Sequence, residues 1–174
     1  MERHDTITVN GLDFAVYLEQ DTDAGTGAPW DNEDGHGPVR EGSRHAYGVT
    51  DKRPGERPLN QAGRRDTQFF YDWQEAMRIA KRDGWDAPPY KTGTKGEQAA
   101  RAVLADFNHL RGFVNGDWVY VGVRVVRLDG DGEETDESDS LWGVESGGDY
   151  WREVAEELAD GIAQTYWAAQ GEAA

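Results

Sequence analysis

Four valines occupy alternate positions in one segment of the chain: Val119, Val121, Val123 and Val125. Successive side chains of a β-strand point to opposite faces, so these four valines share one face. The segment from Trp118 to Leu128 therefore predicts a long strand whose apolar face must be covered by another layer. The opposite face carries Trp118 and Tyr120, which we expect to be partly exposed and available for contact with a partner.

An Asn10-Gly11 pair predicts a β-hairpin near the N-terminus. Apolar residues stand at every second position on both sides of this pair. Asn and Gly both tolerate the positive φ angles that a type I′ turn requires. We expect strands at about 5–9 and 12–19.

Two capping boxes and a third apolar stripe predict three helices. The boxes are Asp72–Glu75 and Thr94–Glu97, and Gly84 and Gly112 supply the expected stops. The last helix begins near Asp149. The expected buried positions are Trp73, Ala76, Met77 and Ala80, then Ala100, Val103, Leu104 and Phe107, and finally Val154, Ala155, Leu158 and Ile162.

The elements follow one another in the order β-β-α-α-β-β-α, with Leu141–Val144 as the returning strand. This order favours an α+β fold with an antiparallel sheet of about four strands and helices packed on one face. The 174 residues fit a single domain, 1–174. Residues 20–67 are rich in Gly, Pro and Arg and predict a long irregular loop.

The net charge of −16 is distributed unevenly along the chain. Residues 128–174 contain 14 acidic residues and one basic residue, Arg152. Adaptation to high salt would spread acidity over the whole surface, which this pattern does not do. A strongly negative surface repels nucleic acids and anionic membranes and attracts basic partners.

The acidic residues near the C-terminal hairpin are the first candidate for a functional site. We expect them to form one face that binds a basic protein surface, in the manner of a nucleic-acid mimic. The alternative is a solvated turn whose charges protect the hairpin from aggregation. An EF-hand is excluded because Glu134 and Ser140 replace its required Gly and Glu, although a looser cation site stays open. The face comprises Asp129, Asp131, Glu133, Glu134, Asp136, Glu137, Asp139, Glu145 and Asp149.

A basic loop over residues 40–65 is the second candidate, because arginines interleaved with an aromatic residue can bind single-stranded nucleic acid. Its main residues are Arg53, Arg57, Arg64 and Arg65. The alternative is that this loop folds back onto the acidic part of its own chain or of a second copy.

The third candidate is His36, which follows Asp31, Glu33 and Asp34. An imidazole beside carboxylates could bind a divalent metal ion and support hydrolysis. Gly35 and Gly37 flank the histidine, which equally fits an ordinary turn.

Other motifs of catalysis are missing. The chain contains no cysteine, no phosphate-binding loop and no G-x-S-x-G motif, so we expect a non-enzymatic protein without a cofactor. It contains neither a signal-peptide pattern nor an apolar run long enough to span a bilayer, which favours a cytoplasmic protein.

Three segments resemble a family of small acidic proteins of bacteriophages and prophages whose function is uncharacterised. They are GAPWDNEDGHGPV at 27–39, YDWQEAMRIAKRDGW at 71–85, and the block at 110–146. The resemblance implies an accessory gene of a mobile element whose product binds a protein in the host cytoplasm. A defence factor or a nucleic-acid-processing factor is the expected target.

Overall fold

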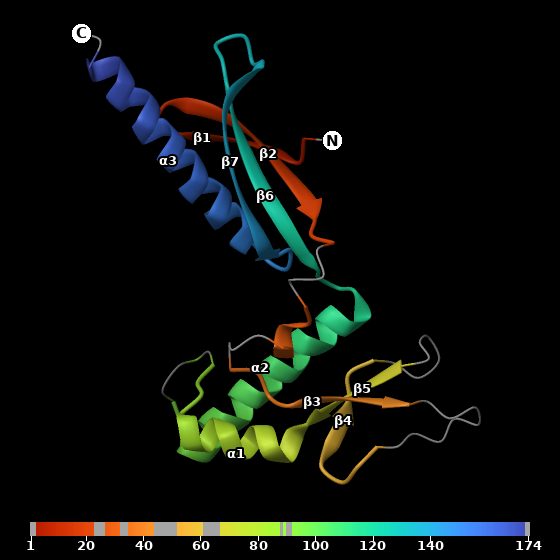
Figure 1. Cartoon of the computed structure of the whole chain (residues 1–174). Helices are drawn as coiled ribbons and strands as arrows, with labels where there is room; N and C mark the ends of the chain where they lie inside the picture. Colours follow the sequence, from red (N-terminus) through yellow and green to blue (C-terminus); the bar gives the residue numbers. More distant parts are fainter. Residues whose placement is uncertain are drawn as a thin grey trace. The chain divides into compact units, whose positions relative to one another are not determined.

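The chain is an α+β protein, and its computed structural model describes residues 3–22, 27–31, 35–43, 52–60, 67–87, 89 and 92–172. Its elements divide between two compact units (Figure 1). We call Met1–Thr26 with Trp118–Ala174 the split unit, and Gly27–Asp117 the inserted unit. Each unit contains its own large apolar cluster, and the expectation of a single domain over residues 1–174 stays a prediction.

The split unit is an antiparallel sheet covered on one face by a helix. Its strands are β1 (Asp5–Val9), β2 (Leu12–Gln20), β6 (Tyr120–Leu128) and β7 (Glu134–Glu145), in the order β1-β2-β6-β7. Helix α3 (Tyr150–Glu172) covers one face (Figure 1). The valine face of β6 packs against this helix, as predicted, in a cluster that includes Val121, Val123, Val125, Val154, Ala155 and Ala159.

The N-terminal hairpin is also confirmed. Asn10 and Gly11 have φ angles of 51° and 80°, as a two-residue turn requires. Helix α3 holds this turn at two points. Asn10 Nδ2 donates a hydrogen bond to Asp160 Oδ1 over 2.6 Å, and Trp167 Nε1 donates to the Asn10 carbonyl over 3.2 Å.

The chain leaves and re-enters the split unit at adjacent strand ends. Gln20 is the Cα partner of Val121, and Asp21 N donates to the Tyr120 carbonyl over 2.9 Å. The inserted unit therefore takes the place of a simple turn between β2 and β6. Insertions are tolerated at such positions because the strand pairing on either side is kept.

The inserted unit has its own small sheet and two helices. Its strands are β3 (Val39–Ser43), β4 (Glu56–Pro58) and β5 (Thr67–Asp72), in the antiparallel order β3-β5-β4. The helices are the short 3₁₀ helix η1 (Pro29–Asp31), α1 (Trp73–Asp83) and α2 (Lys95–Asn115). The core comprises Leu59, Tyr71, Ala76, Ala80, Ala99, Val103, Phe107, Leu110 and Val114.

The prediction of an irregular loop over residues 20–67 is wrong for its described parts, because η1, β3 and β4 lie there. The two strands are short and carry Gly or Pro, so their own sequences give little strand signal. They form by pairing with β5, in which Phe70 and Tyr71 are almost fully buried.

All three predicted helix starts are confirmed, with α3 beginning at Tyr150, next to Asp149. Asp72 accepts a hydrogen bond from Glu75 N, and Thr94 forms a complete capping box with Glu97. The predicted stop at Gly112 is wrong, since α2 continues to Asn115 and Gly116 takes the left-handed conformation instead. Gly84 ends α1 as expected.

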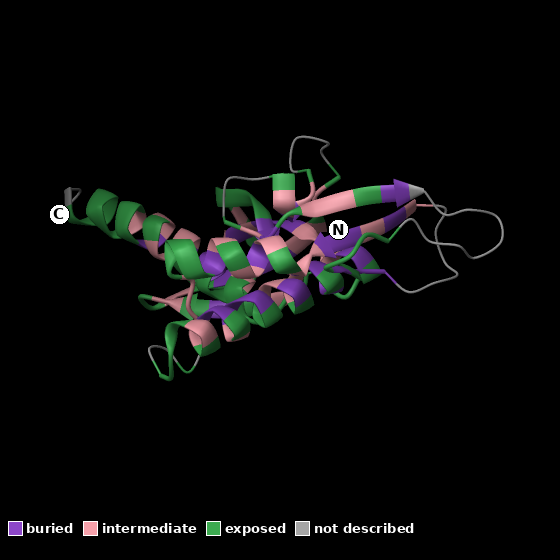
Figure 2. Cartoon of the chain, turned by 90° about the horizontal axis from the view of Figure 1, so that it is seen from below, coloured by how far each residue is buried: buried purple, intermediate pink, exposed green. Residues whose placement is uncertain are grey.

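The buried face of α2 also differs from the prediction, because Ala100 and Leu104 are exposed and Ala99 and Ala102 are buried. In α3, burial ends early, and no described residue after Ala163 is buried (Figure 2). The last turns of α3 are therefore open to solvent along most of their surface.

Candidate functional site

A groove of about 430 Å³ lies between β7 and the second half of α3. The β7 side carries three carboxylates, and the α3 side carries apolar and aromatic groups. Such a lining combines negative charge with an apolar wall, which suits a long cationic side chain. The lining residues are Asp136, Glu137, Ser138 and Asp139 of β7, and Gly161, Ile162, Thr165, Tyr166, Ala169 and Gln170 of α3.

Irregular pairing of β7 with β6 brings these carboxylates to the groove. Leu128 pairs with Glu134, whereas Val126 pairs with Ser138, so β7 carries extra residues opposite a short stretch of β6. A bulge of this kind bends a strand and redirects its side chains. Beyond the bulge, Asp139 pairs with Val125, which faces α3.

Arg127 of β6 lies against the groove and is only 15% exposed. Its guanidinium forms an ion pair with Glu137 and lies 4.6 Å above the ring of Tyr166. Both of these partners line the groove. The three carboxylates of the groove thus have one positive charge beside them, that of Arg127, so the groove keeps a net negative charge.

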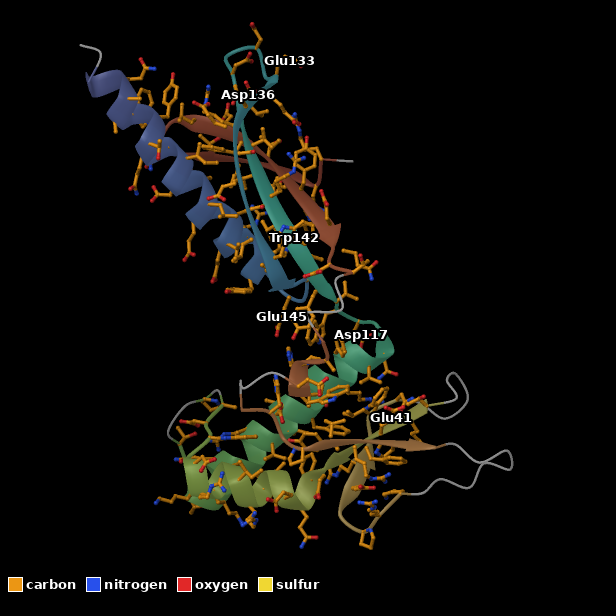
Figure 3. The ribbon with its side chains drawn as sticks, in the orientation of Figure 1. Glu41, Asp117, Glu133, Asp136, Trp142 and Glu145 are labelled. Carbon is orange, nitrogen blue, oxygen red and sulfur yellow. The ribbon has the colours of Figure 1, made fainter. Side chains whose placement is uncertain are left out.

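The nine acidic residues predicted as one face lie in several places. Asp131 and Glu133 are exposed in the turn between β6 and β7, and Asp149 is exposed before α3. Glu134 accepts a hydrogen bond from Tyr17, on the sheet face away from α3. Glu145 lies at the other end of β7 from Glu133 and Asp136 (Figure 3). Only Asp136, Glu137 and Asp139 meet in the groove.

Asp129 has a structural role in the β6–β7 turn. Its Oδ1 accepts hydrogen bonds from the backbone N–H groups of Glu133 and Asp131, each over 2.9 Å. These hydrogen bonds stabilise the ionised form and hold the pKa of the Asp129 carboxyl below its usual value. The carboxylate is therefore occupied in shaping the turn.

Of the aromatic residues predicted for contact, Trp118 is only 7% exposed, and Tyr120 is half-buried. Their rings pack edge to face with centroids 5.4 Å apart. The exposed apolar side chains on β7 are instead Leu141 and Trp142, at 46% and 52%. The sequence pattern places Leu141 and Trp142 in the returning strand, but it does not indicate that this strand lies at the sheet edge and leaves both side chains exposed.

The described part of the basic loop shows structural contacts. The Arg57 guanidinium lies 3.3 Å from the centroid of the Trp73 ring, and Arg53 is exposed. Arg64 and Arg65 lie outside the described residues. The structure therefore places two of the four arginines named for this loop, Arg53 and Arg57.

His36 belongs to a polar cluster at the middle of α2. Its Nδ1 lies 2.5 Å from Asp106 Oδ1, and its ring stacks on His109 with centroids 5.6 Å apart. Asp106 Oδ2 also accepts hydrogen bonds from Gly37 N over 2.8 Å and from the Tyr71 hydroxyl over 2.7 Å. Burial, and then the Asp106 carboxylate, raise the pKa of the Tyr71 phenol.

This cluster ties the segment before β3 to α2. Asp31 is exposed, and Glu33 and Asp34 lie outside the described residues. No group of three or more His, Asp or Glu side chains that could hold a metal ion occurs in the part of the chain described. No local motif in the sequence links His36 to Asp106 and Tyr71, which follow it by 70 and 35 positions, so neither partner could be predicted.

Comparison of the chain with protein families, with curated proteins and with solved structures found no match. The resemblance to small acidic phage proteins therefore stays a prediction. Within the described residues, none of the helices is both long and apolar enough to cross a membrane.

Proposed function

We propose that this chain is a non-enzymatic binding protein and that the groove between β7 and α3 receives basic side chains of another protein. The partner would be a host protein with a basic surface, and the chain would be the product of a phage or other mobile element. Host-defence and nucleic-acid-processing factors are the classes of target that fit best, because surfaces that bind nucleic acid are basic.

The observation that carries this proposal is the position of Arg127. Its guanidinium pairs with Glu137 and stacks over Tyr166 at the wall of the groove. Arg127 already contacts Glu137 and Tyr166, so an arginine from a partner would bind beside it, along the apolar wall that α3 gives the groove. Asp136 and Asp139, which form no ion pair among the described residues, would supply the additional negative charge.

The charge of the surrounding chain supports the same partner class. Residues 128–174 carry a net charge of −13. A field of this sign speeds the approach of basic proteins and slows the approach of nucleic acids, and both effects weaken as salt rises. We therefore expect binding that depends strongly on ionic strength.

The test measures the binding of a labelled oligoarginine peptide by fluorescence anisotropy. The groove variant is Asp136→Asn with Asp139→Asn, which keeps side-chain size and an oxygen acceptor. The matched control is Glu153→Gln with Glu156→Gln, two exposed positions of α3 outside the groove. Both variants remove two negative charges from the split unit.

We expect the groove variant to bind the peptide about tenfold more weakly, and the control about twofold to threefold more weakly through the long-range field. Raising the salt from about 0.05 M to about 0.5 M should reduce the difference between the two variants. Equal losses for both variants would refute the groove as the binding site.

A further inference from the structure

β7 is an edge strand of the four-stranded sheet. In the order β1-β2-β6-β7, it pairs with β6, and no other strand of the described residues pairs with it. The strand is 12 residues long, which exceeds the usual strand length of about five or six residues. An edge strand presents backbone N–H and C=O groups that can pair with another chain.

Two side chains of β7 accept hydrogen bonds from backbone N–H groups of the same strand. Thr135 Oγ1 accepts a hydrogen bond from Glu137 N over 3.3 Å, and Asp139 Oδ1 accepts one from Ser140 N over 2.8 Å. Pairing with β7 of a second copy would bring acidic side chains close to one another, which is unfavourable. The edge therefore disfavours self-association.

The same charges favour a basic strand. We infer that the partner docks as an extended segment that adds a fifth strand beside β7 and directs Lys or Arg side chains into the groove. This inference rests on the proposed function and specifies the form in which the partner is bound. Main-chain hydrogen bonds supply affinity in this mode, and alternate side chains supply specificity.

The side chains that β7 places on the α3 side of the sheet predict the sequence pattern of the added strand. Asp139 pairs with Val125 and Leu141 pairs with Val123, so both side chains lie on the α3 side of the sheet. Leu141 is 46% exposed there. A strand beside β7 would place one side chain next to Asp139 and the side chain two residues away next to Leu141. We expect a basic residue at the first position and an apolar residue at the second.

The experiment uses the full chain and two peptides of about ten residues. In both peptides arginine alternates with threonine, except that leucine replaces the arginine two positions after a central arginine. The first peptide is unmodified. The second has the same sequence and charge but is N-methylated at alternate backbone amides, which removes hydrogen-bond donors. This second peptide is made in two versions, one for each amide register, because either edge of the peptide can face β7.

We expect the unmodified peptide to bind and one methylated register to bind about tenfold more weakly or worse, because several main-chain hydrogen bonds are lost. Slower hydrogen exchange in β7 amides should accompany binding of the unmodified peptide. If both methylated registers bind as well as the unmodified peptide, strand addition is refuted and the groove keeps its proposed function. If every peptide binds the double variant Asp136→Asn with Asp139→Asn as tightly as it binds the wild type, both the groove and the added strand are refuted.

Discussion

The indole ring of Trp142 lies directly over the backbone of Gly122 on the neighbouring strand. A Cβ atom built on Gly122 would fall 2.5 Å from Cε3 of Trp142, closer than real contacts allow. Gly122 stands between Val121 and Val123, so the contact is on the sheet face away from α3. The ring is 52% exposed even in this position. Glycine is therefore required at position 122 for Trp142 to lie flat on the sheet.

Gly122→Ala should displace the indole ring into solvent. We expect a loss of about 1–2 kcal/mol in the free energy of unfolding, measured by urea denaturation, together with stronger quenching of tryptophan fluorescence by acrylamide. Gly130→Ala in the same hairpin is the control, because a Cβ there meets nothing within 4 Å. It should change the free energy by less than about 0.5 kcal/mol. Equal effects would contradict the close packing of Trp142.

The split unit should fold without the inserted unit. Replacing residues 23–117 by Asn-Gly would join Thr22 to Trp118 through a loop of about five residues between Asp21 and Tyr120, which are already hydrogen-bonded. The core of β1, β2, β6, β7 and α3 lies wholly within the retained chain. We expect a cooperative thermal transition by circular dichroism. A shortened chain that lacks such a transition would show that the split unit depends on the inserted one.

Local signals in the sequence were enough to predict the features that neighbouring residues stabilise. The Asn10-Gly11 turn and the caps at Asp72 and Thr94 each depend on a few adjacent residues. β3 and β4 were missed because their stability comes from pairing with β5. The insertion was missed for a related reason, since the pairing of Gln20 with Val121 spans the whole inserted unit.

The candidate site could be predicted only in part. The acidic composition pointed to the segment around Asp136, but the returning strand was expected only from Leu141 to Val144, because Asp and Glu are poor strand formers, whereas β7 begins at Glu134. An edge strand accepts such residues, since one side of its backbone faces solvent. A bulge in β7 brings Asp136, Glu137 and Asp139 to the groove and leaves the other carboxylates elsewhere. This bulge arises from the register of β7 with β6, which composition does not encode.

The ion pair of Arg40 and Glu56 should stabilise the inserted unit in a pH-dependent way. Arg40 Nε and Nη2 each donate to Glu56 over 2.8 Å, and the Glu56 side chain is 5% exposed. The hydrogen bond from Arg40 lowers the pKa of Glu56 below its usual value of 4.5. The stabilisation is therefore complete above that value and is lost as the pH falls through the lower pKa of the folded state.

Arg40→Met should cost about 2–4 kcal/mol of unfolding free energy at neutral pH, because the buried carboxylate of Glu56 loses the Arg40 guanidinium and keeps the hydrogen bond from the backbone N–H of Arg53. The difference from the wild type should shrink in acid, below about pH 4. Urea denaturation across this pH range provides the measurement. Arg82→Met is the control, since its pair with Asp83 is largely exposed and should matter little. A cost for Arg40→Met that does not change with pH would contradict the assignment.

Asp106→Asn should destabilise the inserted unit by about 2–3 kcal/mol. Donors from His36, Gly37 and Tyr71 converge on the Asp106 carboxylate, and an asparagine offers them one oxygen and a competing N–H group. Thermal denaturation should show the loss, whereas Asp83→Asn at an exposed site should show almost none. If Asp106→Asn leaves the stability unchanged, the cluster does not act by holding the segment before β3 on α2.

Arg127→Gln should strengthen the binding of basic peptides, whereas Asp136→Asn with Asp139→Asn should weaken it. Removing the guanidinium releases Glu137 from its ion pair and leaves Tyr166 uncovered, so the groove becomes more negative. We expect affinity for oligoarginine to rise about twofold to fivefold at low salt, at a cost of about 1 kcal/mol in stability. Arg124→Gln removes the same charge from the opposite face of β6, where Arg124 lies 4.5 Å above the ring of Tyr17. The two variants change the net charge identically, so a larger gain in peptide affinity for Arg127→Gln can only come from the groove. Equal gains in affinity would show that the peptide responds to the overall charge of the protein alone.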